Sequence, residues 1–383
     1  MIDWSQWAEE PNKSNLNEYP TITDIVEDII GEEEDRVENK YPLLHNRTIF
    51  SKLKTNGCYF MMSQTGDNTN IELLPASKSG MTYYRGQSIF HSPCKPSLYR
   101  EEKQINRNIL ISSLQTAELI CCLRKHPVIW DIMMTRLNYD NKLFNVPIPI
   151  HFEGLAQHYG IKTCFLDITA NKWVAAFFAI TLNEDERYFP VDTTNPNHPR
   201  YGVFYRYSWQ KPDGGMRNDE IHAIGQHYFN RPGRQSALVI NLREQDDFNM
   251  IDGVEKVFFR HDNKATNLIY DLCQQGRIFF PNDSLSSTIN AFIKGTTYSE
   301  EAVACCNKTY YPFVEYNRFL QWIYENGLSI SSNPQMVFDA EKMDIEYQLW
   351  LREGKQRFLD NIYAIPMMKI PKEQYNQTPI AVQ

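Results

Sequence analysis

The sequence predicts an α+β protein, with a central mixed β-sheet, flanking helices, and helical extensions at the N- and C-terminal ends. Short apolar runs typical of buried strands occur at 161–167, 201–208 and 236–242. Apolar residues recur at helical spacing in 21–40 and again beyond about residue 300. The chain has 383 residues, 42% of them hydrophobic, which is enough for one large domain with additions or for two modest domains.

The N-terminal region, residues 1–54, is expected to be an arm followed by an acidic amphipathic helix. Residues 1–20 are polar and contain two prolines as breakers, which predicts a loose arm. Residues 21–40 place isoleucines and a valine on one side, opposite an acidic face that ends at 32–35. This pattern favours a solvated amphipathic helix over an acidic binding tail.

Strands are expected next, near 58–62 and 72–74, followed by helices over 101–140 with a break at Pro127. Further along, 183–200 has three prolines and no periodicity. Such a segment predicts a long loop that can move over a site.

The middle of the chain has the pattern of a helix, a turn and a strand. Helix 152–159 ends at Gly160, whose missing Cβ suits a left-handed cap, and strand 161–167 follows. Asp167 is therefore expected at the carboxyl end of a core strand. Ligands favour that place in α/β sheets.

The helix that follows, 173–180, is apolar nearly all round and is expected to be buried. Thr169 or Asn171 can cap it through a side-chain oxygen, and Asp262 or Asn263 can cap a later helix in the same way.

Charge and hydropathy exclude several classes of protein. The formal net charge is -8 and no run of Lys and Arg occurs, so general nucleic-acid binding is not expected, although a local basic pocket can still hold a small anion. The first ten residues lack the positive and apolar regions of a secretory signal. The longest apolar stretch, 173–182, is about half of what spans a bilayer. We expect no membrane association.

The cysteines suggest a reducing compartment. Eight are present, including the adjacent pairs Cys121-Cys122 and Cys305-Cys306, and no C-x-x-C occurs. Neither a zinc site nor a disulfide framework is suggested, no metal is expected, and the predicted location is the cytoplasm.

Five spaced blocks, taken in order, resemble the FRG domain, a family named for an aromatic-Arg-Gly motif. The likeness covers roughly 55–295 and leaves 296–383 as a C-terminal helical extension, which covers the core or contacts a protein partner. Ile168 departs from the Trp that the family more often has there, a change that is tolerable if the side chain only packs. The blocks are Tyr84-Arg85-Gly86-Gln87, Pro96 to Arg100, Leu155 to Gly160 with Leu166 to Thr169, Arg231 to Leu238, and Phe279 to Asp283.

A second, more distant resemblance is to ADP-ribosyltransferases, which act on NAD. It implies that Arg85 holds the pyrophosphate of NAD and that Gln235 occupies the polarising position near the ribose. The chain departs from that pattern because it has no Ser-Thr-Ser strand and no Glu at this place. Gln235 cannot act as a base, so binding survives this departure better than catalysis.

Four residues are candidates for catalysis: Arg85, His158, Asp167 and Gln235. Arg85 offers a planar fork of donors for phosphate, or it forms a buried ion pair with Asp167. Asp167 can orient Arg85, accept from a ribose hydroxyl or act as a general base; otherwise it caps the following helix. His158 relays a proton or is structural. Glu153 forms a hydrolytic pair with Asp167 if the two converge, and otherwise lies on a helix surface.

The candidates for ligand binding flank these residues in the same blocks. For Thr169 and Asn171 the alternative is capping, and for the arginines it is a solvated surface. They are Tyr84, Gly86, Gln87, Gln157, Thr169, Asn171, Arg231 and Arg234.

The leading hypothesis is an intracellular NAD-handling or ADP-ribosyltransferase-like enzyme, acting as a toxin or bacterial defence effector, with NAD as substrate and no certain cofactor. A second hypothesis is a non-catalytic module that senses a nucleotide or another phosphate-bearing ligand. A third is a protein-interaction scaffold, for which the polar motifs are purely structural.

Overall fold

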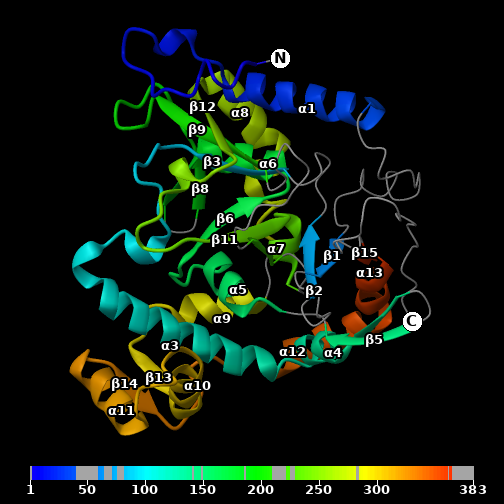
Figure 1. Cartoon of the computed structure of the whole chain (residues 1–383), viewed down its shortest axis with the longest axis vertical. Coiled ribbons are helices and arrows are strands. Elements are labelled where there is room, and N and C mark those ends of the chain that lie inside the picture. Colours follow the sequence, from blue (N-terminus) through cyan, green and yellow to red (C-terminus); the bar gives the residue numbers. More distant parts are fainter. Residues whose placement is uncertain are drawn as a thin grey trace.

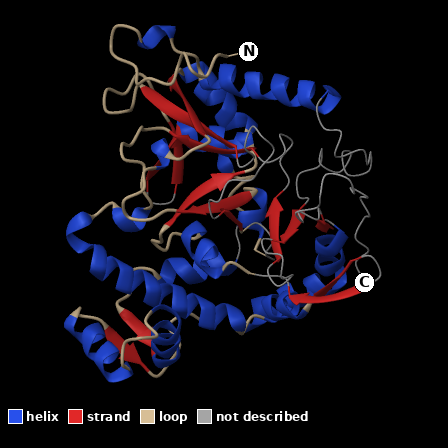
Figure 2. Ribbon diagram, viewed as in Figure 1, coloured by secondary structure: helices blue, strands red, loops and turns tan. Residues whose placement is uncertain are grey.

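The computed structural model describes residues 2–39, 59–63, 71–75, 82–139, 142–147, 150–184, 187–208, 221–224, 229–281, 284–360 and 362–364. Its centre is a six-stranded β-sheet with helices packed around it, so the α+β prediction is confirmed (Figure 2). The strands of this sheet are β3 (Thr82–Gln87), β6 (Phe165–Thr169), β9 (Tyr201–Ser208), β10 (Ile221–Ala223), β11 (Ala237–Asn241) and β12 (Val254–Arg260).

Helices and short paired strands make up the remaining regular structure. The helices are α1 (Ile22–Asn39), α3 (Ile105–Arg124), α4 (Pro127–Met134), α5 (Phe152–His158), α6 (Lys172–Ile180), α7 (Asn230–Arg234), α8 (Asn263–Leu272), α9 (Ser284–Phe292), α10 (Glu300–Tyr310), α11 (Tyr316–Glu325), α12 (Ala340–Leu349) and α13 (Lys355–Asp360). The short strands are β1 (Tyr59–Ser63), β2 (Ile71–Pro75), β4 (Arg136–Tyr139), β5 (Lys142–Pro147), β7 (Thr181–Glu184), β8 (Arg187–Pro190), β13 (Thr297–Ser299), β14 (Ser329–Ser331) and β15 (Ile362–Ala364).

The strand order of the central sheet is β10-β11-β6-β3-β9-β12, and each neighbouring pair is antiparallel. Parallel pairing occurs in smaller sheets, between β1 and β15 and between β13 and β14. Because side chains alternate along a strand, β3, β9 and β12 each contribute to two different hydrophobic cores.

On one face, the apolar helix α6 packs on β3 and β9. The core here, called the α6 core, includes Tyr84, Val174, Phe177, Phe204 and Phe259. Helices α1 and α8 complete it from above α6, as Figure 1 shows. The prediction that 173–180 is a buried helix is confirmed, and the glycine-free run of Val, Ala and Phe explains why this helix buries nearly every side.

The opposite face of the sheet is covered mainly by loops. Its core contains Tyr83, Ile168, Tyr205 and Phe258, with Phe248 from a 3-10 turn. Ile168 is buried there and packs, as the sequence analysis required for a residue that departs from the family pattern.

A third core, called the α3 core, lies below the sheet. Helices α3, α5 and α9 bury apolar side chains against the C-terminal helices, with Leu114, Leu155 and Ile289 on one side and Val303 and Phe319 on the other. Figure 1 shows α3 crossing the molecule between the sheet and the C-terminal elements α10, α11, β13 and β14. The described part of the C-terminal region therefore packs into the same core as α3.

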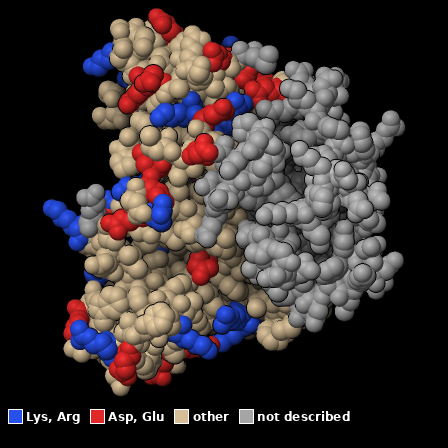
Figure 3. Space-filling view, in the orientation of Figure 1, with Lys and Arg blue, Asp and Glu red and all other residues tan. Residues whose placement is uncertain are grey.

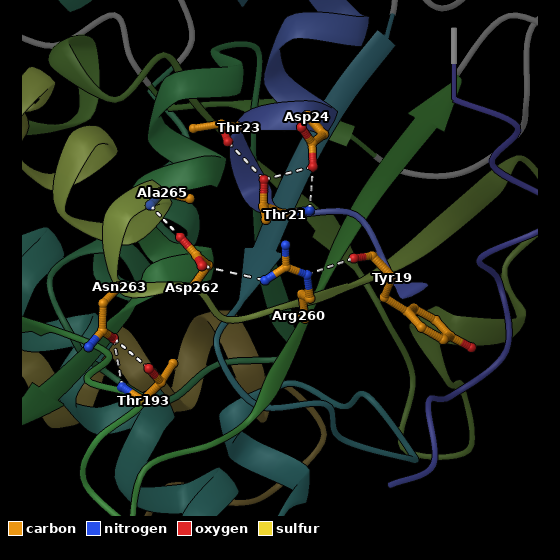
Figure 4. Close-up of polar contacts among 9 residues, drawn as sticks. All are labelled: Tyr19, Thr21, Thr23, Asp24, Thr193, Arg260, Asp262, Asn263 and Ala265. Atoms are coloured by element: carbon orange, nitrogen blue, oxygen red, sulfur yellow. Dashed lines mark hydrogen bonds and ion pairs between the residues drawn. The ribbon is translucent and has the colours of Figure 1, made fainter. Parts of the chain in front are cut away.

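The prediction of a loose arm at 1–20 is wrong. Trp4 is buried in the α6 core, and the backbone NH of Phe258 donates to the Trp7 carbonyl at 2.8 Å. Arg260 Nε donates to the Tyr19 carbonyl at 3.1 Å (Figure 4). Thr21 then donates to the Asp24 carboxylate in the first turn of α1 (Figure 4). Burial of Trp4 and the hydrogen bonds to β12, an edge strand of the central sheet, hold this segment in place despite its polar composition.

Local signals placed most helix ends correctly. Gly160 has φ +95 after α5, and Pro127 opens α4. Asp262 accepts from the Ala265 NH at 3.0 Å as the cap of α8 (Figure 4). Asn171, rather than Thr169, caps α6 through the Trp173 NH at 3.0 Å.

Two predictions in this part of the chain need correction. The segment 183–200 is not all loop, because β7 and β8 pair as a hairpin before the loop begins. The strand predicted at 161–167 starts later, at Phe165, and ends at Thr169, so Asp167 lies in its middle. The strands expected near 58–62 and 72–74 are confirmed as β1 and β2.

The visible surface carries charges of both signs, interspersed over the elements seen in Figure 3. In the portion of the chain that the structure describes, no helix combines the length and the apolar character needed to cross a membrane.

Candidate functional site

A cavity of about 1320 Å³ opens beside β3 and β6, and its walls also come from α5, α6 and the loop after β8. It is larger than the roughly 300–1,000 Å³ of most small-molecule pockets. Asn171 and Arg234 are not among the residues that line it. The predicted site residues that do line it are Tyr84, Arg85, Gly86, Gln87, Gln157, His158, Asp167, Thr169, Arg231 and Gln235.

The cavity exists because β3 and β6 part. The two strands are paired at Tyr84 and Thr169 alone; continued pairing would have set Gly86 opposite Asp167. Where the strands separate, backbone groups lose their ladder partners. Arg85 compensates, because its Nη1 donates to the backbone carbonyl of Asp167 at 2.5 Å. Arg85 therefore bridges the gap through the backbone, and the predicted ion pair with the Asp167 side chain is replaced by this contact.

Gly86 is required by packing. A Cβ at this position would lie 1.9 Å from the carbonyl oxygen of Ala175 and 2.7 Å from Cβ of Ala179. The glycine thus lets α6 approach β3, and this close approach fixes the floor of the cavity. Its neighbour Tyr84 is buried in the α6 core, with its ring 6.0 Å from that of Phe204.

Gln87, two residues after Arg85, lies on the same face of β3. The Tyr205 hydroxyl donates to its Oε1 at 3.2 Å, and the Cys94 thiol lies 3.8 Å from the same oxygen. These contacts hold the side chain at the edge of the cavity.

The carboxylate of Asp167 is held by two side chains from α5. Gln157 Nε2 donates to Oδ2 at 3.0 Å, and His158 Nδ1 lies 3.8 Å from Oδ1. The Asp167 side chain is 43% exposed, and it lines the cavity, whose walls surround it. Burial alone would raise the pKa of Asp167. The close approach and charge of His158, the hydrogen bond from Gln157 and the charge of Arg85 outweigh this effect, and the pKa is lowered from its ordinary value.

Two further basic side chains, those of Arg100 and His91, line the cavity near Arg85. Burial lowers the pKa of Arg100, and the charge of Arg85 lowers it further. Burial also lowers the pKa of His91, with smaller effects from Arg100 and Arg85. Two guanidinium groups and an imidazole are therefore close enough to disfavour one another's charged forms. An anion between them would relieve this repulsion.

Part of the cavity wall is aromatic. The rings of Tyr188 and Phe280 stack at 4.6 Å with an interplanar angle of 19°, and Phe178 meets both edge-on. The Arg231 guanidinium lies 5.0 Å from the Phe280 ring centroid and 5.4 Å from that of Tyr159. Planar ligands and cations favour such surfaces.

Gln235 lines the cavity, but its side chain is hydrogen-bonded to the protein backbone. The residue is 3% exposed, and its Nε2 donates to the Phe279 carbonyl at 3.0 Å. Its own carbonyl accepts from the Thr169 hydroxyl at 2.6 Å. It caps α7 rather than lying on β11, and Ser236 between them has φ +42. This kink at Ser236 turns the chain from α7 into the strand.

The remaining candidates lie elsewhere. Asn171 is occupied as the cap of α6, and Arg234 is exposed at the end of α7. Glu153 accepts from the Tyr310 hydroxyl at 2.9 Å and so faces α10. A hydrolytic pair of Glu153 and Asp167 is therefore not formed.

Sequence reasoning missed His91, Arg100 and the aromatic wall. Arg100 ends one of the family-like blocks, so its position beside the motif was a usable signal. His91 had no such signal. Tyr188 and Phe280 come from segments read as a loop and as a closing block, and only the fold brings them together. Among the residues with described positions, no group of three or more His, Cys, Asp or Glu side chains could hold a metal ion.

The fold and the cavity define an α+β protein with a large pocket lined by three arginines, Arg85, Arg100 and Arg231. Residues 80–187, a stretch that runs from β3 through α6 to the first residue of β8, match the family model of the FRG domain. No curated protein and no solved structure matched the chain.

Proposed function

We propose that the FRG-domain cavity binds a phosphate-bearing nucleotide of the NAD type and that the protein is an NAD-handling, ADP-ribosyltransferase-like enzyme. The observation that carries the proposal is the convergence of Arg85, Arg100 and His91 on a cavity that also contains the Asp167–His158 pair.

The basic part of the wall supports a diphosphate as its occupant. Guanidinium groups present paired donors to phosphate oxygens. Arg85 has one of its donors committed to the Asp167 carbonyl, and the rest of its fork remains for the ligand. Arg100 donates from Nε to the Lys95 carbonyl at 3.1 Å, which orients its terminal nitrogens. The aromatic part of the wall, with Tyr188 and Phe280, supplies a surface on which a base can stack.

Asp167 and His158 supply the chemistry in this proposal. Because the pKa of Asp167 is lowered, its carboxylate is ionised at neutral pH and suits hydrogen bonds from ribose hydroxyls. As nicotinamide leaves, positive charge develops on the ribose, and a fixed carboxylate stabilises it. Gln157 holds that carboxylate in place. In this proposal, a role as a toxin or defence effector depends on the release of nicotinamide from NAD.

A non-catalytic sensor is the second candidate, and Gln235 favours it. The amide of Gln235 is bonded to the Phe279 backbone, and no carboxylate occupies this position. The cavity would then bind the same nucleotide without cleaving it. A protein partner on the C-terminal helices would receive the signal.

One experiment separates the candidates. Binding of NAD, ADP-ribose and ATP is measured by calorimetry, and nicotinamide release is followed over time. Arg100→Ala should weaken binding about 10–100-fold, because it removes a charge-assisted contact. Arg234→Ala is the matched control, since this arginine is exposed outside the cavity. Release of nicotinamide that is lost in Asp167→Asn supports the enzyme. Binding without release supports the sensor, and the absence of binding to all three nucleotides overturns both.

A further inference from the structure

Away from the cavity, two adjacent cysteine pairs lie on helices that pack against each other. Cys121-Cys122 is in α3 and Cys305-Cys306 is in α10 (Figure 1). Two contacts fix how the helices align: Lys125 Nζ to Glu301 Oε2 at 2.5 Å, and the Ser113 and Tyr311 hydroxyls at 3.5 Å. Lys125 comes after Ser113 in the sequence, whereas its partner Glu301 comes before Tyr311, so the two helices are antiparallel.

This alignment places Cys121 opposite Cys305. Each cysteine is four residues, about one helical turn, from the Lys125–Glu301 ion pair, and both lie on the same side of it. Each thiol shifts the pKa of the other, as expected for side chains that face each other across this helix interface. The remaining cysteines of the pairs, Cys122 and Cys306, instead point into the α3 core.

The surroundings of the two facing thiols differ. Cys305 is partly exposed, whereas Cys121 is 7% exposed. The hydrogen bond from Cys121, a contact with the Thr309 hydroxyl and the charge of Arg124 lower the pKa of Cys305, against burial and Glu301. Burial raises the pKa of Cys122 to about 12 and also raises that of Cys306. The lowered pKa of Cys305 favours its reactive thiolate form, while the raised pKa values of Cys122 and Cys306 keep the core thiols inert.

We propose that Cys305 and Cys121 form a peroxide-sensitive thiol pair that closes a disulfide between α3 and α10. The Cys305 thiolate attacks hydrogen peroxide; an S–O bond forms, the O–O bond breaks, and hydroxide leaves. The Cys121 thiol then attacks the sulfenic acid, the S–O bond breaks, and water leaves with the thiol proton. Two thiols are oxidised and one peroxide is reduced to two waters.

The disulfide would tie the C-terminal helices to the FRG domain. Cys121 lies within the matched stretch 80–187, and Cys305 lies outside it. The Tyr310–Glu153 bond already joins α10 to α5, which carries Gln157 and His158. The cross-link closes a very long loop, so it restricts the unfolded chain strongly.

The test maps the thiols of the full chain. Reduced protein is treated with one equivalent of hydrogen peroxide, alkylated with N-ethylmaleimide, digested without reductant and analysed by mass spectrometry. We expect the loss of two free thiols per chain and one linked peptide pair containing Cys121 and Cys305, both reversed by dithiothreitol. The oxidised protein should have a Tm about 5 °C higher.

Variants separate the steps. Cys305→Ser should slow the loss of thiols at least 10-fold, and Cys121→Ser should leave Cys305 as a sulfenic acid that dimedone traps. Cys164→Ser is the control, because this cysteine is also partly exposed but lies in the loop before β6. Full alkylation of Cys121 and Cys305 after peroxide, or a link between other cysteines, overturns the proposal. The map of the unaltered protein gives this answer even if a variant fails to fold.

Discussion

Hydrogen bonds around Gln157 determine which of its atoms faces the cavity. The backbone NH of Phe165 donates to Thr163 Oγ1 at 3.2 Å, so the Thr163 hydroxyl is free to donate to Gln157 Oε1 at 2.8 Å. That leaves Gln157 Nε2 to donate to Asp167. The orientation of the amide, and with it the position of the carboxylate, is therefore fixed by a threonine outside the cavity.

Removal of that hydroxyl should cost stability. Thr163→Val keeps the shape of the side chain but leaves the Phe165 NH and the Gln157 oxygen without their buried partner. We expect a loss of about 1–2 kcal/mol in the free energy of unfolding, measured with urea at pH 7. Thr163→Ser should recover most of it, because the hydroxyl returns. Equal stability of the Val variant and the unaltered protein would show that the network does not support the fold.

His261 should make the fold sensitive to acid. Its Nε2 donates to the Ser88 carbonyl at 3.0 Å, one residue beyond β3, and burial lowers its pKa from 6.5 to about 4. Between these values the unfolded chain binds a proton that the folded protein does not, so stability falls as the pH falls. From pH 7 to pH 5 we expect this group to cost about 2 kcal/mol.

The control for this effect is His261→Gln, whose amide can donate to the same carbonyl but does not titrate. Urea unfolding at pH 7 and pH 5 should show a loss that is smaller by about the same 2 kcal/mol in the variant. The same loss in both proteins would place the acid sensitivity elsewhere.

At the level of secondary-structure elements, the fit of α6 against β3 supports the cavity. Gly86→Ala would push a methyl group into the Ala175 carbonyl, and neither α6 nor the central strand can move far in a close-packed core. We expect a loss of at least about 3 kcal/mol, or failure to fold, measured by urea unfolding and circular dichroism.

Gly31→Ala is the matched control for that change. Gly31 lies in α1 with no atom within 4 Å of the added Cβ, so alanine should stabilise the helix by about 0.5–1 kcal/mol. A Gly86→Ala protein as stable as the unaltered protein would mean that the helix and the strand are not held as closely as described.

Elements with local signals were predictable from the sequence, whereas the shape of the cavity was not. Gly160, Pro127 and Asp262 each act within one turn of their own helix, so their patterns sufficed. The parting of β3 from β6 depends on the register between distant strands, which no local pattern encodes. The β7–β8 hairpin was missed for another reason: each of its strands has four residues, which is too short for a clear alternating pattern.

Within the candidate site, too, some residues were predictable from the sequence and others were not. The motif around Arg85 and the block around Asp167 were recognisable, and they do lie together at the cavity. Arg234 was grouped with Arg231 because they are near in sequence, but Arg234 is the last residue of α7 and is exposed outside the cavity. Arg100 joined the site through the long excursion between β3 and α3, which the sequence alone does not place.

For the molecule as a whole, the question is whether 55–295 and 296–383 fold independently. The family match covers 80–187 and does not reach this boundary. The α3 core crosses it, and so does Glu118, which is 1% exposed and accepts from the backbone NH groups of Ser299 and Gln335, both at 2.8 Å. A carboxylate with such partners is costly to leave buried without them.

A chain that ends at residue 295 should therefore fail to form a stable fold. The cut exposes Leu114 and its neighbours in α3 and removes both partners of Glu118, so we expect binding of a hydrophobic dye and the loss of a cooperative thermal transition. The full chain with Glu118→Gln separates the two causes, because it keeps the apolar contacts and loses about 1–3 kcal/mol. A truncated chain with a sharp transition and intact near-ultraviolet circular dichroism would instead show that the residues up to 295 fold on their own, with the C-terminal helices as an addition.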